Sequence, residues 1–303
     1  MCSYNLENLY IGLDRHEGED FSEMPEKDWQ LLSISLNQKN KTLSKVLDLA
    51  KIIQTIDADI YCLQEVISET SLVNFNTHFL NDQYEVVLEE SNSNRSIYVG
   101  FLIRKGIDYD ISSYSHWRMK NGSLASRNLS SLVIKKNNHP ILVLLGAHLK
   151  SKRLDEKRLN TYSLRELEVS LLSEIHTDLA LKYSCPILIL GDMNANFNLE
   201  PEFHPLHKKD FFDFVKEKYK ENYVSVGTFT TNYLETKLQH LDFILIEKKY
   251  LDLVELASSD IYLYQNEYGD RISLPFNKIE RPYLPSDHCP IIIKMNLKKG
   301  RSP

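Results

Sequence analysis

The stretch PILILGDMNAN, residues 186–196, carries the pattern that decides the fold. Its first part, Pro186–Leu190, is a continuous apolar run, which is typical of a central strand buried on both faces. Asp192 and Asn194 come directly after this run. Because a strand end at the rim of a sheet presents a side chain rigidly, the stretch predicts a buried sheet with two polar groups at its edge.

Other apolar runs also begin or end at residues that can do chemistry. Glu65 comes after IYCL, and His148 follows ILVLLGA. Asp242 precedes FILI, and Asp287 and His288 precede CPIII. A single acid of this kind is more often a turn residue or a helix cap. Their number and order, with no catalytic cysteine or elbow serine beside them, favour hydrolysis by a metal ion and water, and hard oxygen ligands suit Mg²⁺ or Mn²⁺.

The rest of the pattern predicts α+β layering with mixed sheets rather than a doubly wound parallel sheet. Apolar residues at helical spacing predict helices over residues 39–56 and 156–182. Strands are expected over residues 59–63, 84–88, 97–103, 107–116, 130–135, 141–148, 186–190, 228–232, 241–246, 261–264 and 289–297.

The composition, with 42% hydrophobic and 26% charged residues, is that of an ordinary globular protein. No stretch approaches 18 apolar residues, so no membrane helix is predicted. Without a repeat or a Pro/Gly-rich linker, residues 1–303 are expected to form one catalytic domain. The four cysteines form no CxxC pair, which argues against a zinc site.

The net charge of −6 is confined to the first 37 residues, which hold eight acids and two bases. Residues 12–37 are therefore predicted to be an acidic surface loop, with a helical turn near Trp29. The other 266 residues hold 34 acids and 34 bases. A broad electrostatic clamp on nucleic acid is not visible, although a short groove and a metal ion would suffice for a nuclease.

Six stretches occur in the order in which one large superfamily carries them. The chain resembles the endonuclease/exonuclease/phosphatase superfamily, which includes deoxyribonuclease I and the abasic-site endonucleases. The matching stretches are SYNLENLY (3–10), DADIYCLQEV (57–66), GAHLKSKR (146–153), ILGDMNAN (189–196), LDFILI (241–246) and SDHCPIII (286–293). The resemblance implies an α/β fold, a four-layer α/β sandwich of two packed mixed β-sheets flanked by helices, with the active site at one rim.

The resemblance also implies roles for the metal-binding side. Glu65 matches the glutamate that binds the metal ion, and Asn5 matches the amide that supports this ion or its water. Asp287 matches an acid expected to make a second metal contact. Mg²⁺ is the cofactor implied, with Mn²⁺ as the alternative.

The catalytic side follows by the same resemblance. His288 and Asp242 match a histidine–carboxylate pair, in which the carboxylate orients the ring and the ring acts as general base or as a charged phosphate ligand. Asp192 and Asn194 match the pair that contacts the attacking water and the phosphate. His148 matches a second histidine, aimed at a non-bridging oxygen.

Two basic residues are candidates for binding substrate. Lys150 begins a basic run two residues after His148, and Arg127 lies in SRNL, like an arginine that precedes a strand in the family. The run is more often a solvated helix start, and Arg127 is equally open to a structural role. If the run is functional, phosphate contacts are the expected use.

The substrate is expected to be nucleic acid, hydrolysed at a phosphodiester bond by in-line attack of water. HLKSKR and GDMNAN resemble bacterial nuclease-like members. The alternative is a phosphatase or lipid phosphodiesterase of the same superfamily, acting on an inositol phosphate or on sphingomyelin, but the Trp usual before GDxN in inositol phosphatases is absent. A catalytically inactive binding module is disfavoured because every matched position keeps its residue type. No obligate protein partner is visible.

No signal-peptide pattern follows Met1, so a cytoplasmic location is the default expectation. Asn5, however, matches an asparagine that normally stands near the end of a full first strand, and only four residues precede it. An upstream leader therefore remains compatible with the sequence.

Overall fold

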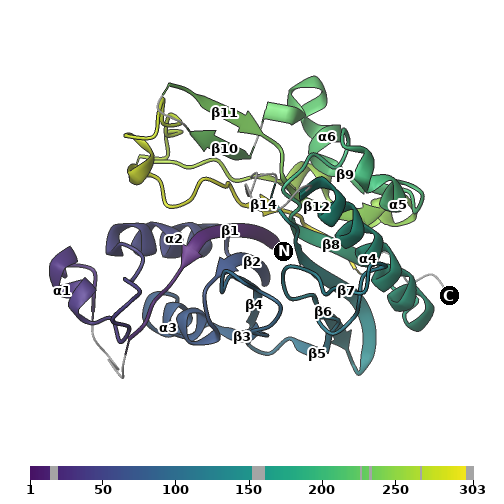
Figure 1. Cartoon of the computed structure of the whole chain (residues 1–303), viewed down its shortest axis with the longest axis horizontal. Coiled ribbons are helices and arrows are strands. Elements are labelled where there is room, and N and C mark those ends of the chain that lie inside the picture. Colours follow the sequence, from purple (N-terminus) through teal and green to yellow (C-terminus); the bar gives the residue numbers. More distant parts are fainter. Residues whose placement is uncertain (14–19, 152–160, 226, 232–233, 267, 298–303) are drawn as a thin grey trace.

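The structure is a computed structural model, and it describes residues 1–13, 20–151, 161–225, 227–231, 234–266 and 268–297. Figure 1 shows two sheets packed against each other, with helices outside them. Within the described residues, no helix combines the length and the apolar character that a membrane crossing requires.

The first sheet has six strands in the order β13-β14-β1-β2-β4-β3. Its strands are β1 (Cys2–Leu9), β2 (Ile60–Val66), β3 (Tyr84–Leu88), β4 (Tyr98–Arg104), β13 (Asp260–Ile261) and β14 (Ile291–Ile292). The central pair β1–β2 is parallel, and β14 pairs with the other side of β1 in the antiparallel sense.

The second sheet also has six strands, in the order β5-β6-β7-β8-β12-β9. Its strands are β5 (Asp108–Ser113), β6 (Ser130–Lys136), β7 (His139–His148), β8 (Ile187–Asp192), β9 (Phe211–Asp213) and β12 (Asp242–Glu247). Here β7–β8 is parallel, whereas β8–β12 is antiparallel. Two more strands, β10 (Thr228–Thr231) and β11 (Thr236–Gln239), form a hairpin.

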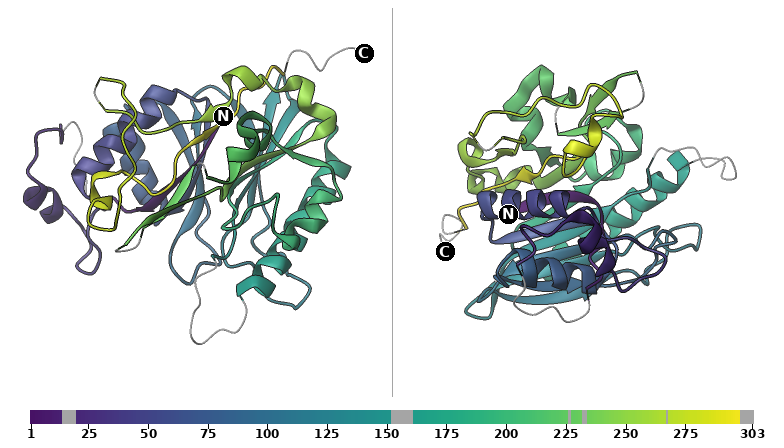
Figure 2. Two further views of the ribbon diagram at one scale, coloured as in Figure 1. Left: turned by 90° about the horizontal axis from the view of Figure 1, so that it is seen from above. Right: turned by 90° about the vertical axis from the view of Figure 1, so that its left-hand side faces the viewer.

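Strand periodicity explains the four layers. Successive side chains of a strand point to opposite faces, and in β7 Leu142 and Leu144 belong to the core between the sheets. Val143 and Leu145, which alternate with them, pack with the helix α4 (Thr161–Lys182) in a second core on the outer face. The predicted α/β sandwich of two mixed sheets is therefore confirmed (Figure 2).

The remaining helices are short or cover the first sheet. They are α1 (Glu26–Leu31), α2 (Leu43–Ile56), α3 (Glu69–Phe79), α5 (His204–His207) and α6 (Phe214–Tyr219), with the 3₁₀ turns η1 (Pro201–Phe203), η2 (Lys220–Ser225), η3 (Lys248–Leu253), η4 (Leu256–Ser258) and η5 (Arg281–Tyr283). The predicted helical turn near Trp29 is α1, and Trp29 and Phe21 are buried in the core. The part of the acidic segment at 14–19 lies outside the described residues.

Most predicted elements are confirmed, although the strand predicted over 107–116 is only Asp108–Ser113, and two others differ more. The predicted strand over 289–297 contains only Ile291–Ile292 in regular pairing, and the one over 261–264 ends at Ile261. The apolar residues of these segments are partly or fully buried, but the backbone beyond the short strands makes no continuous ladder of strand hydrogen bonds. Helix α3 was not predicted, although Ser68 caps it by accepting the backbone N–H of Ser71. The first residues of the predicted helix over 156–182 lie outside the described residues.

Candidate active site

Strand register brings three of the predicted residues side by side. His148, the last residue of β7, lies opposite Asp192, the last residue of β8. Asp192 in turn lies opposite Asp242, the first residue of β12. Because β7 and β8 are parallel and β12 runs the other way, the ends of two strands meet the start of a third at one edge of the second sheet.

Gly191 makes this arrangement sterically feasible. Its φ is +144°, and a Cβ at this position would lie 1.8 Å from the carbonyl oxygen of Ala147 on β7. Only glycine permits so close an approach of the two backbones. The glycine of the GDMN stretch therefore sets the close β7–β8 contact immediately before Asp192.

Two strands of the first sheet and the segment before β14 contribute three more of the predicted side chains. Asn5 lies in the middle of β1, Glu65 is near the end of β2, and His288 precedes β14. Glu65 has φ +58° and occupies a bulge. The pairing of β2 with β4 shifts register between Leu63 and Val66, and the pairing of β2 with β1 shifts opposite the same residues. Such a conformation costs a non-glycine residue about 1–3 kcal/mol and is found often at functional sites.

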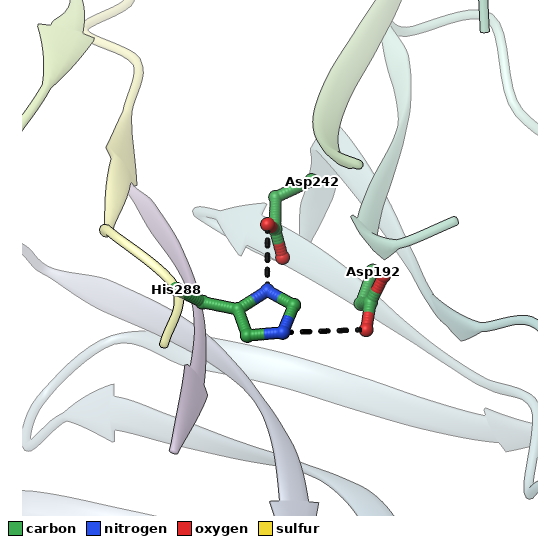
Figure 3. Close-up of side chains that lie close together, drawn as sticks. All are labelled: Asp192, Asp242 and His288. Carbon is green, nitrogen blue, oxygen red and sulfur yellow. Dashed lines mark hydrogen bonds and ion pairs between the residues drawn. The ribbon is translucent and has the colours of Figure 1, made fainter. Parts of the chain in front are cut away.

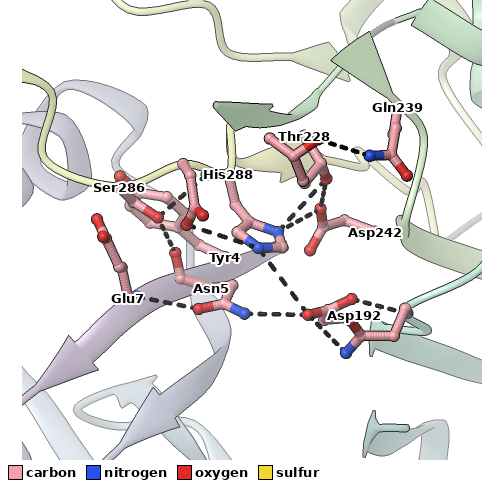
Figure 4. Close-up of polar contacts among 12 residues, drawn as sticks. Tyr4, Asn5, Glu7, Asp192, Thr228, Gln239, Asp242, Ser286 and His288 are labelled. Atoms are coloured by element: carbon pink, nitrogen blue, oxygen red, sulfur yellow. Dashed lines mark hydrogen bonds and ion pairs between the residues drawn. The ribbon is translucent and has the colours of Figure 1, made fainter. Parts of the chain in front are cut away.

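A buried hydrogen-bonded pair joins His288 to Asp242. His288 Nδ1 lies 2.8 Å from Asp242 Oδ2, and Thr228 donates its hydroxyl to the same oxygen (Figures 3 and 4). Burial lowers the pKa of His288, but the carboxylates of Asp242 and Asp192 outweigh it and raise this pKa well above its ordinary value. The ring is therefore oriented by Asp242, and its Nε2 faces Asp192 at 4.0 Å.

Asp192 stands at the centre of the polar network. Its Oδ2 accepts hydrogen bonds from the amides of Asn5 and Asn194, each at 3.1 Å (Figure 4). Its Oδ1 accepts the backbone N–H of Asn194 at 2.8 Å. Burial, together with the neighbouring carboxylate of Asp242, raises the pKa of Asp192, although the charge of His288 opposes this shift. Asp192 is thus a buried carboxylate whose negative charge requires the cations and amides around it.

His148 has the opposite protonation tendency to His288. It is buried, its Nε2 lies 3.6 Å from Asp192 Oδ2, and its Nδ1 has no hydrogen-bond partner among the described residues. Burial, and then the nearby charge of Arg127, lowers the pKa of His148 well below its ordinary value. We therefore treat His148 as neutral, despite its proximity to Asp192, because desolvation disfavours the charged ring.

One pocket joins these residues. Its lining includes Glu65, His148, Asp192, Asn194, Asp287, His288 and Arg127, all of which the sequence analysis singled out. Burial raises the pKa of Glu65, even though the charge of His288 opposes this effect. Asn194 lines the pocket while its amide also donates to the carbonyl of Leu149 at 3.0 Å.

Lys150 is held beside the pocket by its backbone. Its N–H donates to Glu168 at 2.7 Å, and its carbonyl accepts from Arg165 at 3.1 Å. Arg165 is itself buried in an ion pair with Glu202 at 2.6 Å. The buried charges of α4 and η1 therefore fix the path of the chain after β7, where the pocket wall continues with Ser151.

Several pocket residues had no predicted role. Arg95, Arg281, Glu7 and Thr228 line the pocket, and Arg281 contacts both Glu7 and Asp287. Glu7 stands two residues after Asn5 in the same quoted stretch, but its φ of +51° and the bulge in β1 break the alternation that would assign its face. Arg95 lies in a turn and Arg281 in the short 3₁₀ turn η5, where the spacing of residues in the sequence does not indicate which way a side chain points.

Three side chains could hold a metal ion, namely Asp192, Asp242 and His288, whose ligand atoms all lie within 4.8 Å of one another (Figure 3). Oxygen donors suit hard divalent ions. The buried Oδ1 of Asp242 has no hydrogen-bond partner among the described residues, so a ligand atom is available. The predicted metal residues Glu65 and Asp287 line the same pocket, and Asn5 contacts it through Asp192. The donor set thus fits a divalent cation.

Known structures resemble this chain over nearly its whole length. Truncated TDP2 from Caenorhabditis elegans has a TM-score of 0.58 and 16% identity, with 96% of this chain and 94% of that chain covered. An endonuclease/exonuclease/phosphatase family protein from Bacteroides thetaiotaomicron has a TM-score of 0.53 and 15% identity, with 96% and 95% covered. A mannosyl-6-phosphatase from the same organism has a TM-score of 0.55 and 15% identity, with 97% and 98% covered.

These likenesses concern the fold, because the identities are low. No model of a known protein family and no curated protein sequence matches the chain. The chain has the fold of the endonuclease/exonuclease/phosphatase superfamily, a superfamily of hydrolases, and the predicted resemblance is confirmed at this level. Within that fold lies the buried Asp–Asp–His cluster that could hold a metal ion.

Proposed function

We propose that the protein is a divalent-metal-dependent phosphodiesterase that hydrolyses nucleic acid. The observation that carries this proposal is the cluster of His288, Asp242 and Asp192, of which His288 and Asp192 line one pocket together with Asn194 and further carboxylates. An oriented imidazole beside a buried carboxylate cluster suits activation of water against a phosphate ester. Mg²⁺ is the proposed ion, held by carboxylates that include Glu65.

The proposed reaction assigns a task to each side chain. A bound divalent ion would offset the negative charge that develops on the phosphoryl oxygens. His288 Nε2 takes the proton of the attacking water, and Asp242 holds the resulting imidazolium through Nδ1. A bond forms between the water oxygen and phosphorus, the bond to the leaving oxygen breaks, and that oxygen takes a proton from solvent.

Neutral and cationic donors complete the site. His148, kept neutral by burial, can donate an N–H to a non-bridging oxygen. Asn194 can do the same through its amide, and Arg127 brings a charge into the pocket. Such donors act most strongly where charge grows in the transition state, and in a buried site they are already oriented.

Nucleic acid is proposed as the substrate because cations stand along the pocket. Arg95 and Arg127 line it, and neither has a carboxylate within ion-pair distance among the described residues. Lys150 follows on the chain after His148. The cations are few, so we expect only about 2–4 phosphates to be neutralised on binding, which predicts a modest dependence of affinity on salt.

A substrate panel tests the proposal. Protein dialysed against EDTA is assayed with plasmid DNA, RNA, bis-p-nitrophenyl phosphate, an inositol phosphate, a sugar phosphate and sphingomyelin, each with Mg²⁺, Mn²⁺ or EDTA. A His288→Ala preparation, purified identically, controls for contaminating nucleases. Cleavage of nucleic acid that requires the metal ion and His288 is the expected result.

Two outcomes would contradict the proposal at different levels. Full turnover in excess EDTA would overturn metal dependence. A preference for the monoesters or for sphingomyelin, with nucleic acid intact, would overturn the substrate while leaving the hydrolytic site in place.

Lys150→Ala with Lys152→Ala should weaken nucleic-acid binding and flatten its salt dependence, but leave bis-p-nitrophenyl phosphate turnover nearly unchanged, because that substrate has no flanking phosphates.

A further inference from the structure

Arg281 lies between two carboxylates that come from opposite ends of the chain. Its Nη2 is 2.5 Å from Glu7 Oε1 and 2.6 Å from Asp287 Oδ2. All three residues line the pocket. The other oxygen of Asp287 lies 3.8 Å from His288 Nε2. A side-chain cation therefore occupies the position between two acids at the edge of the proposed metal-binding cluster.

The geometry is that of a counter-ion rather than of an optimised ion pair. Arg281 contacts both acids through one terminal nitrogen, without the two parallel hydrogen bonds of a bidentate pair. Its buried Nε has no hydrogen-bond partner among the described residues. An unsatisfied buried donor costs about 1–3 kcal/mol, so the contact is weaker than an arginine–carboxylate fork.

We infer that Arg281 is an exchangeable counter-ion, which holds Glu7 and Asp287 together until a divalent cation displaces it. The inference rests on the proposed metal-dependent function. Glu7 and Asp287 would repel each other without a cation between them. A doubly charged ion bound next to His288 would attract Asp287 through Oδ1, the oxygen that faces His288, and so compete with the contact that Arg281 makes to Oδ2 of the same carboxylate. Arg281 is thus a positioning residue that acts on the metal-binding side chains.

Displacement of Arg281 would release the segment that carries it. Arg281 begins η5, in the long connection from β13 to β14. Phe276, Ile279 and Tyr283 in this connection are exposed by 67%, 75% and 83%. Leu284, directly after η5, is buried in the core, so sparse packing is confined to the part of the connection before it, where the ion pairs of Arg281 are among the attachments. Local opening is easiest where such packing is sparse.

Mn²⁺ binding to two charge-removing variants tests the exchange. Arg281→Gln removes the displaced cation, whereas Lys45→Gln removes a cation that also pairs with Glu7, at 3.4 Å, but not with Asp287. Isothermal titration with Mn²⁺ alone should show about threefold to tenfold tighter binding for Arg281→Gln, tenfold being about 1.4 kcal/mol. Lys45→Gln should change the affinity much less. Arg281→Lys, which keeps the charge, should return the affinity towards that of the wild type.

Hydrogen exchange provides a second readout, in the wild-type protein and in Arg281→Gln. Adding Mn²⁺ should raise amide exchange over residues 276–285, and in Arg281→Gln this exchange should already be high without the ion. Equal or weaker Mn²⁺ binding by Arg281→Gln, or equal tightening in Lys45→Gln, would overturn the inference. So would unchanged exchange on adding Mn²⁺. If the wild type binds no Mn²⁺ at all, the proposed function fails as well, so the two failures are distinguishable.

Discussion

Asp242 Oδ2 and His288 Nδ1 are 2.8 Å apart, although Asp242 begins β12 of the second sheet and His288 lies 46 residues later, in the segment before β14 of the first. This contact orients the ring so that Nε2 faces the pocket. It joins the start of β12 to a residue three positions before β14, across the interface of the sandwich. The proposed general base is therefore positioned by packing of one sheet on the other.

The pair should behave as one unit in mutational kinetics. Asp242→Asn is expected to lower kcat/KM like a weaker version of His288→Ala, because the amide still contacts the ring but no longer stabilises its charge. The double variant should lose little more than His288→Ala alone. A double-mutant cycle on bis-p-nitrophenyl phosphate measures this. Strictly additive losses would show that the two residues serve separate steps.

The pH dependence of the pair follows from the direction of the shift. Asp242 and Asp192 raise the pKa of His288, and a general base must be neutral, so the rate should rise as pH increases through that raised value. Asp242→Asn removes one of these charges, so its rise should occur at lower pH. An NMR titration of the His288 ring in metal-free protein should show the same downward displacement. An unshifted titration would contradict the assignment.

The same shift also has a consequence for stability. The pKa of His288 is higher in the folded state than its ordinary value of 6.5 in the unfolded state. The charged ring therefore stabilises the fold fully at pH values below 6.5. This stabilisation is lost as the pH rises through the pKa of the folded state. The difference in unfolding free energy between wild type and Asp242→Asn should therefore shrink as pH increases. Urea denaturation of the metal-free proteins across this range measures it.

Glu65→Gln should separate function from folding. The substitution keeps the size of the side chain and removes its charge, and we expect a loss in turnover of about 100-fold or more. Burial already raises the pKa of Glu65, so removing this carboxylate should not lower the melting temperature. A large drop in melting temperature, with turnover reduced only in proportion to folded protein, would instead identify Glu65 as structural.

Gly191→Ala should destabilise the fold through the β7–β8 contact. The added Cβ would lie 1.8 Å from the carbonyl oxygen of Ala147, so the strands must separate. A loss of about 1–3 kcal/mol or more in unfolding free energy is expected. Gly122→Ala is the matched control, because Gly122 also has positive φ, +81°, but nothing lies within 4 Å of its Cβ. Equal losses in both variants would show that φ alone, not the strand contact, determines the effect.

The sequence predicted the parts of the site that stand at strand ends. His148, Asp192 and Asp242 are adjacent to long apolar runs, and runs of this kind become neighbouring strands whose ends meet. The two-sheet fold could be predicted by resemblance. The alternation of β7 side chains between the two cores accounts for the layers of the sandwich. These features depend on short-range patterns, which a single sequence records.

The remaining parts depend on long-range contacts that no local pattern records. Arg281 and Arg95 lie in long connections between strands. The contacts that these connections make with the rest of the protein therefore decide where the two side chains point. Glu7 lies in a strand with positive φ, +51°, where the bulge changes the face that alternation would assign. The strand after His288 was predicted too long for a related reason, since its burial comes from neighbours and not from continuous pairing.

The position of β1 between β2 and β14 also constrains how the protein is made. A ribosome synthesises β1 first in this sheet and β14 last, so during translation one edge of β1 stays without its partner. His288 emerges only with the segment that closes this edge. Assembly of the sheet and arrival of the proposed general base are therefore nearly simultaneous, and a nascent chain would gain hydrolytic capacity only in the last step of its folding.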